Sequence, residues 1–244
     1  PEAYLLPFVS EDKKKGSYAP SISVSALTGA QEELLKKHLS RFRFLSCREQ
    51  QGTELLRKIL DRDVACLIDP TLLLSASEWA RVSTPVHADA PYILSYFLGD
   101  VAEHRDFVNR LAAKTGYPVL SLPFSYRELS STVWKQQWCG PDKFLSLLQN
   151  AAIVCTDSFH GTAFSINFNV PFFAFCKTRD TEKGSENSRL YSALEMFALS
   201  GRLVSGSAIP EKLEVDFSHA NEVLAQKRRE ANAYLEEMLK TITE

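Results

Sequence analysis

The chain has 244 residues, and 45% of them are hydrophobic, which is enough for one large domain or two small ones. Its 28 basic and 30 acidic residues leave a net charge of -2. Nucleic-acid-binding proteins usually carry a strong basic excess, so this balance argues against a nucleic-acid partner.

The first predicted elements form a partial α/β lobe, residues 1–75. They are a strand, an amphipathic helix and a second buried strand, at residues 43–47, 53–60 and 64–68. Pro70 marks the end of the second strand, because proline lacks the amide hydrogen that a central strand needs. Residues 76–90 contain few aliphatic side chains, and we expect them to be a linker.

A more regular series begins at residue 91 and predicts a second lobe, residues 91–244. Strands are expected at residues 92–98, 117–122, 153–156 and 171–176. Helices are expected between them, at residues 100–114, from Gly140 onward, and at residues 158–167. Gly116 suits the left-handed end of the first helix. Short apolar strands that alternate with amphipathic helices predict a parallel sheet covered on both faces.

The remaining elements follow a polar segment, residues 177–188, whose composition predicts a mobile loop. We expect this loop to close over a bound ligand, as active-site lids often do. Two helices should follow it, at residues 189–199 and about 218–242.

No uninterrupted apolar run approaches the roughly 20 residues of a membrane-spanning helix. The longest candidate, residues 163–176, is broken by two asparagines and a proline. The chain also opens without the pattern of a signal peptide. We therefore expect a cytoplasmic protein, with peripheral contact at the inner face of the membrane as a compatible location.

The five cysteines are irregularly spaced and form no Cys-x-x-Cys pair. An odd number at such spacing argues against a disulfide framework or a structural zinc site. The five histidines are scattered singly, so no metal is expected. Reduced, buried thiols fit a cytoplasmic location.

Polar residues gather where predicted strands end, which is where ligands bind in open α/β sheets. One strand leads directly into five polar residues and a glycine: Thr156, Asp157, Ser158, His160, Thr162 and Gly161. The amides of a helix N-terminus bind anions, and histidine adds a proton donor near neutral pH. On the residues alone, the alternative remains open that His160 packs against the sheet and bonds a backbone carbonyl.

Three other polar residues stand at the ends or starts of predicted elements. Arg48 ends its strand, and its guanidinium fork suits a phosphate or carboxylate, with an ordinary surface arginine as the alternative. Asn187 and Arg189 open the helix after the polar loop, where simple N-capping is the alternative. Dinucleotide-binding, Walker, metalloprotease and serine-hydrolase motifs are absent from the sequence.

Taken in order, several segments resemble the polysaccharide pyruvyl transferase family over nearly the whole chain. They are Ser46–Glu49, Leu67–Leu74, Tyr92–Tyr96, Gly140–Pro141, Thr156–Ser165 and Asn187–Leu190. The resemblance implies two Rossmann-like lobes, as in B-type glycosyltransferases, with the active site in the cleft between them. It also implies that the first lobe is incomplete, because members usually begin with a further α/β stretch.

The resemblance further implies transfer of a pyruvyl group from phosphoenolpyruvate to a saccharide or lipid-linked saccharide, without another cofactor. His160 would act as general acid, and Arg48 would contact the anionic groups of the donor. From their places at strand ends and helix starts, the expected substrate-binding residues are Thr156, Asp157, Ser158, Gly161, Thr162, Tyr96, Gly99, Asn187 and Arg189.

Ser158 departs from the family pattern, because many members have arginine two residues before the histidine. We expect another cation to compensate: Lys177, Arg179, Lys183 or Arg189. Two other functions remain open. One is a glycosyltransferase that holds a nucleotide sugar through Glu186, Asn187 or Arg189, and the other is a non-catalytic remnant of the fold.

Overall fold

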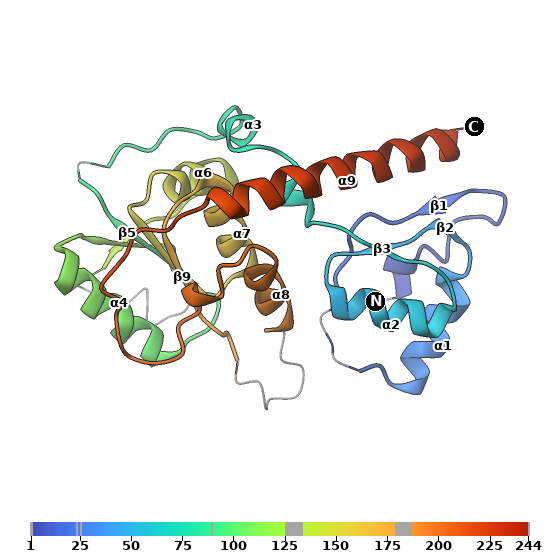
Figure 1. Ribbon diagram of the computed structural model, residues 1–244, viewed down its shortest axis with the longest axis horizontal. Helices are drawn as coiled ribbons and strands as arrows, with labels where there is room; N and C mark the ends of the chain where they lie inside the picture. The colour runs from blue at the N-terminus through green and yellow to red at the C-terminus, as the bar shows by residue number, and fades with distance from the viewer. Residues whose placement is uncertain are drawn as a thin grey trace. The chain divides into compact units, whose positions relative to one another are not determined.

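The computed structural model describes residues 2–22, 24, 26–88, 90–124, 134–178 and 187–243 (Figure 1). Its contacts divide the chain into two compact units. Unit 1 comprises Pro1–Leu73, Lys183–Ser192 and Leu224–Glu244, and unit 2 comprises Leu74–Glu182 and Ala193–Val223. Both units contain parallel strands and helices, which confirms the predicted α/β class.

Unit 2 is built on a five-stranded parallel sheet. The strands are β5 (Ile93–Tyr96), β6 (Val119–Ser121), β7 (Lys135–Gln136), β8 (Ile153–Thr156) and β9 (Phe172–Ala174). Their order is β7-β6-β5-β8-β9. The chain therefore runs outward from β5 to β7 and then returns to place β8 on the other side of β5. The carboxyl ends of β5 and β8 form the topological switch point, where such sheets bind ligands.

Helices cover both faces of this sheet. From α4 (Ala102–Thr115), the side chains of Phe107, Val108 and Leu111 pack with Ile93 and Phe97 on one face. Tyr96 points to the opposite face, because side chains alternate along a strand. There its ring meets Phe144 of α6 (Pro141–Gln149) at 5.2 Å. The helix α7 (Phe159–Phe168) packs beside α6.

The sequence signals for the helix ends in unit 2 are confirmed. Gly116 ends α4 with φ 72°, a conformation that favours glycine. Pro141 occupies the first turn of α6, where its missing amide hydrogen costs nothing. The predicted linker, residues 76–90, contains one short helix, α3 (Ala76–Ala80), which Ser75 and Glu78 begin with a capping box.

Unit 1 has two short parallel strand pairs. β1 (Lys15–Gly16) pairs with β2 (Phe42–Phe44), and β3 (Ser46–Cys47) pairs with β4 (Ala65–Cys66). Short 3-10 turns at Glu2–Leu5 and Pro70–Leu72 and two longer helices complete it, α1 (Gly29–Leu39) and α2 (Gln50–Leu60).

The prediction of one strand over residues 43–47 is wrong, because the strand is divided at Leu45. The amide of Ser46 donates to the hydroxyl of Ser17 instead of continuing the ladder with β1. The Leu45 carbonyl instead accepts from the amide of Ala65, next to β4. The chain thus changes strand partners at a buried leucine, which an apolar pattern cannot indicate.

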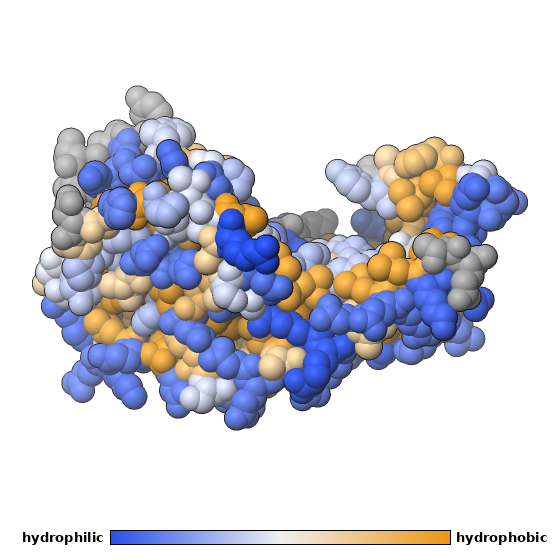
Figure 2. Space-filling model, turned by 90° about the horizontal axis from the view of Figure 1, so that it is seen from above, coloured by the Kyte–Doolittle hydropathy of each residue, from blue (hydrophilic) through white to orange (hydrophobic). Residues whose placement is uncertain are grey.

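The last elements are α8 (Ser188–Met196), a 3-10 turn (Ser200–Arg202) and α9 (Ser218–Thr243). In unit 1, α9 lies against β1 and β2: the Tyr234 hydroxyl donates to the Ser17 carbonyl at 2.9 Å, and the Tyr234 ring meets Phe44 edge-on. Within the described ranges, no helix is both long enough and apolar enough to cross a membrane. Figure 2 shows hydrophilic and hydrophobic residues intermixed over the face that it presents.

Candidate functional site

Asp157 joins the two strand ends at the switch point. Its carboxylate accepts hydrogen bonds from the amides of Leu98 at 2.6 Å and Gly99 at 2.8 Å. Burial raises the pKa of Asp157, and the two amides and the Lys177 ammonium oppose that rise. Asp157 therefore fixes the loop after β5 to the loop after β8.

Thr156 and Ser158 hold the first turn of α7. The Thr156 hydroxyl donates to the Tyr96 carbonyl at 2.6 Å and accepts from the Ser158 amide at 3.0 Å. The Ser158 hydroxyl accepts from the Gly161 amide at 3.4 Å and so caps the helix. A Cβ atom on Gly161 would lie 2.5 Å from the Thr156 hydroxyl oxygen, so this close approach requires glycine.

His160 is the exposed residue of this turn. It is the second residue of α7, and its ring lies 5.4 Å from that of Phe159. Thr162, two residues later, is fully buried, and its hydroxyl has no hydrogen-bond partner among the described residues. The turn thus presents the imidazole outward while its hydroxyls hold the helix in place.

Lys177 brings positive charge to the same edge of the sheet. It follows β9, and its Cγ atom lies 3.5 Å from the position that a Cβ on Gly99 would occupy. Its side chain is exposed, and its charge acts on Asp157. The sequence signal for Lys177 was its place as the first charged residue after an apolar strand. Arg179, Lys183 and Glu186, and with them most of the expected mobile loop, lie outside the described residues.

Arg48 belongs to unit 1, where two buried carboxylates hold it. Its Nε donates to Glu49 at 3.1 Å, and its Nη1 pairs with Asp69. The side chains of Glu49 and Asp69 are 2% and 1% exposed. Asp69 also caps the turn at Pro70–Leu72 through the amide of Thr71. This network holds the segments Ser46–Glu49 and Leu67–Leu74 together.

Asn187 and Arg189 stand at the start of α8. The Asn187 carbonyl accepts from the Tyr191 amide at 3.0 Å, and Asn187 is buried. Arg189 is half-buried. Both fall in Lys183–Ser192, which belongs to unit 1, whereas His160 belongs to unit 2.

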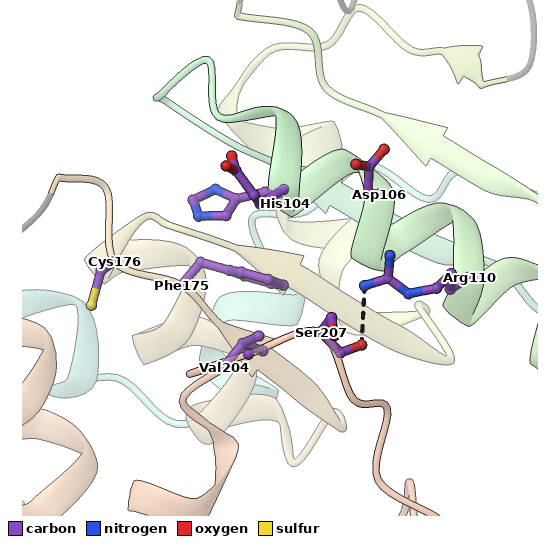
Figure 3. A pocket seen from close by; sticks show the side chains of 9 residues that line it. His104, Asp106, Arg110, Phe175, Cys176, Val204 and Ser207 are labelled. Atoms are coloured by element: carbon purple, nitrogen blue, oxygen red, sulfur yellow. Dashed lines mark hydrogen bonds between the residues drawn. The ribbon is translucent and has the colours of Figure 1, made fainter.

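A pocket of about 410 Å³ lies on the α4 side of the sheet in unit 2 (Figure 3). His104 lines it, with its ring 4.7 Å from that of Phe175. Its Nδ1 atom is buried and has no hydrogen-bond partner in the described part of the chain. Burial lowers the pKa of His104 to about 4. Arg110 closes another side of the pocket by donating to the Ser207 carbonyl at 3.0 Å.

The cysteines give no sign of a metal or disulfide site. All five are free, and Cys47 and Cys155 are buried. Burial raises the pKa of the Cys47 thiol to about 12, which keeps it protonated at neutral pH. Within the described ranges, no three His, Cys, Asp or Glu side chains are grouped so that they could hold a metal ion.

Three solved structures illustrate what the chain resembles in space. A Listeria monocytogenes protein described as a UDP-N-acetylglucosamine 2-epimerase shares 14% identity and a TM-score of 0.45, over 79% of this chain and 59% of its own. The glycosyltransferase SnogD from Streptomyces nogalater shares 12% identity and a TM-score of 0.41, over 80% of this chain and 63% of its own. The wall teichoic acid polymerase TagF shares 13% identity and a TM-score of 0.42, over 88% of this chain and 58% of its own.

This chain therefore spans about six-tenths of the length of each of those structures. A comparison with curated protein sequences found no match. The family described as "Polysaccharide pyruvyl transferase" matches residues 1–175, which include the strand end at Thr156–Thr162 and the Arg48 network. The chain belongs to the polysaccharide pyruvyl transferase family.

Proposed function

We propose that the protein transfers a pyruvyl group from phosphoenolpyruvate to a saccharide or lipid-linked saccharide, with His160 as general acid. The observation that carries this proposal is the exposed His160 side chain in the first turn of α7, at the switch point of the sheet. Membership of the family supports a transferase with a saccharide acceptor. The identity of the donor is part of the proposal.

The donor carries a phosphate and a carboxylate, so its site needs positive charge. The amides at the N-terminus of α7 and the dipole of the helix favour an anion. Lys177 adds a full charge beside Gly99. In this proposal Lys177 compensates for the arginine that many family members have where this chain has Ser158, and no further cofactor takes part.

His160 would begin the reaction by giving a proton to the methylene carbon of phosphoenolpyruvate. The neighbouring C2 then becomes oxocarbenium-like, and one sugar hydroxyl forms a C–O bond to it and loses its proton. The first hydroxyl's proton returns to His160. A second hydroxyl forms the other C–O bond as the bond from C2 to the phosphate oxygen breaks, and its proton leaves with the phosphate. The products are a ketal, whose pyruvyl carbon 3 is now a methyl group, and inorganic phosphate.

The test measures phosphate release and ketal formation by the full-length protein with phosphoenolpyruvate and a panel of saccharides. A positioned acid contributes about 10²–10⁴-fold, so His160→Gln and His160→Ala should lower kcat/KM by about 100-fold or more. His219→Gln is the matched control, since His219 is also exposed and lies outside the site. Retention of more than about a tenth of the rate would contradict the general-acid role.

The same assay separates the other two functions. Turnover of UDP- or CDP-sugars in place of phosphoenolpyruvate would make the protein a glycosyltransferase. A folded protein without either reaction would be a binding module. The same proposal places the reaction in the cytoplasm, where a lipid-linked acceptor would be reached at the inner face of the membrane. Fractionation of cells that contain the full-length protein tests this location.

A further inference from the structure

A second pocket of unit 2, about 430 Å³, lies on the α6 side of the sheet. It is formed by the segments that follow β6 and β7 and by the start of α6, so it opens at the same carboxyl edge as the switch point. Four aromatic side chains line it: Tyr96, Phe124, Trp138 and Phe144. We call these four residues the aromatic pocket.

Two of these rings are unusually open to solvent. Trp138 and Phe124 are each 68% exposed. The other two tryptophans are engaged in the fold: Trp134 is buried and donates to Asn109 at 2.8 Å, and Trp79 packs edge-on against Phe164 at 5.3 Å. Large apolar side chains exposed together at the rim of a cavity are typical of a binding site.

The lining also indicates what kind of ligand group would fit. No charged side chain lines this pocket among the described residues. The anionic donor would therefore bind at the N-terminus of α7 and Lys177 rather than in this pocket. Gln137, whose side chain lies beside the Trp138 carbonyl, supplies an amide that can bond hydroxyls. A neutral pyranose ring has an apolar face that can pack on aromatic rings and hydroxyls that can bond to an amide, so it suits this pocket.

Tyr96 connects the aromatic pocket to the proposed chemistry. Its ring packs against Phe144 in the pocket; burial raises the pKa of its phenol, and the nearby Ser158 side chain opposes that rise. Ser158 is the cap of the helix whose second residue is His160. A sugar ring on Trp138 would therefore lie next to the side chains that hold the first turn of α7.

We propose that the aromatic pocket is the acceptor subsite, in which Trp138 stacks on a pyranose ring of the saccharide. This inference rests on the proposed function for the identity of the acceptor. A nucleobase is the competing occupant, because bases also stack on aromatic rings. The saccharide is favoured because the family acts on polysaccharides and the pocket carries no charge for a nucleotide's phosphates.

The decisive experiment follows tryptophan emission of the full chain during titration with methyl glycosides of galactose, mannose, N-acetylglucosamine and N-acetylmannosamine, without phosphoenolpyruvate. At least one glycoside should change the emission of the wild type and of Trp79→Phe, but not that of Trp138→Phe. Because this readout needs no turnover, it can succeed even where the pyruvyl transfer fails.

Kinetics then separate acceptor from donor. We expect Trp138→Ala to raise the acceptor KM roughly ten-fold or more and to leave the KM for phosphoenolpyruvate nearly unchanged, with Trp138→Phe retaining part of the affinity. Thermal unfolding checks that the variants are folded. An emission change with uridine or cytidine and none with the glycosides would overturn the inference. So would a panel of glycosides that leaves the Trp138 emission unchanged, or an unaltered acceptor KM in Trp138→Ala.

Discussion

Arg48 has partners in unit 1 before any ligand binds. Glu49 and Asp69 are almost fully buried, and together they carry one more negative charge than Arg48 neutralises. A buried carboxylate without its cation is costly, because the remaining donors, among them the Ile22 amide at Glu49 and the Thr71 amide at Asp69, replace its lost hydration only in part. The primary structural effect of Arg48 is thus to make two buried acids tolerable.

Removing this guanidinium should therefore destabilise the chain. We expect Arg48→Ala to lower the free energy of unfolding by about 3 kcal/mol, measured by urea denaturation. Arg43→Ala, on an exposed neighbour, should change it by less than about 0.5 kcal/mol. Equal effects of the two substitutions would show that the carboxylates find other partners. Donor titration of Arg48→Lys, which keeps the charge, then tests the predicted donor contact separately.

His104 makes stability depend on pH. Its pKa in the folded chain is about 4, below its ordinary value of 6.5, mainly because of burial; Glu103 raises it and Arg105 lowers it further. Between these values the unfolded chain binds the proton and the folded chain does not, so stability is lost as pH falls from 6.5 toward 4. Above 6.5 the effect vanishes, because His104 is neutral in both states.

The non-titrating variant His104→Phe retains a ring beside Phe97 and Phe175. Between pH 7 and pH 5 the wild type should lose about 2 kcal/mol more unfolding free energy than this variant. His219→Gln, on an exposed histidine, should follow the wild type. Parallel curves for wild type and His104→Phe would show that His104 protonates without opening the fold.

At the scale of elements, the contact between β8 and α7 decides where His160 stands. Gly161 lies against Thr156, with 2.5 Å between the Thr156 hydroxyl oxygen and the position of an added Cβ. A methyl group there must push the helix away from the strand end, because Thr156 is itself fixed by the Tyr96 carbonyl. The position of His160 thus depends on glycine one residue later.

We expect Gly161→Ala to lower the free energy of unfolding by about 1–3 kcal/mol and to reduce kcat. Gly29→Ala is the matched control, since Gly29 also begins a helix but has nothing within 4 Å of its added Cβ. That substitution should be neutral or slightly stabilising. Calorimetry and the phosphate-release assay measure both effects, and a fully active, stable Gly161→Ala protein would refute the packing argument.

At the scale of the whole molecule, α9, like α8, is divided between the two units. It is 26 residues long, and the unit boundary falls at Leu224. In unit 1, Arg228 donates to the Leu72 carbonyl at 2.8 Å, and Met238 covers Gly16. This helix supplies apolar cover that the short pair β1–β2 needs, because an isolated strand pair is marginally stable.

A chain that ends at Val223 should therefore lose hydrogen-exchange protection in β1 and β2, while β5 and β8 keep theirs. The parallel five-stranded sheet has its own core from α4 and does not depend on the removed segment. Tyr234→Phe removes one hydrogen bond and should give a smaller change in the same peptides. Equal loss of protection in both units would mean that they unfold as one cooperative structure.

Much of unit 2 could be predicted from local sequence. The apolar run 153–156 is the strand Ile153–Thr156, and the left-handed end at Gly116 follows from its missing side chain. Alternating strands and helices were enough to predict a parallel sheet, because only helices on both faces can bury such strands. The position of His160 at a strand end followed from the same pattern.

Only the tertiary structure decided which elements and side chains become neighbours, because a local sequence pattern does not contain that information. β7 has the polar sequence Lys135–Gln136 and is a strand only because β6 offers it a ladder. Arg48 meets Asp69 from 21 residues away, and Asp157 meets Leu98 from 59 residues away. Periodicity reports which face of an element is buried, but not which neighbour buries it. Strand order, the switch point between β5 and β8, and the aromatic pocket all depend on that choice of neighbours.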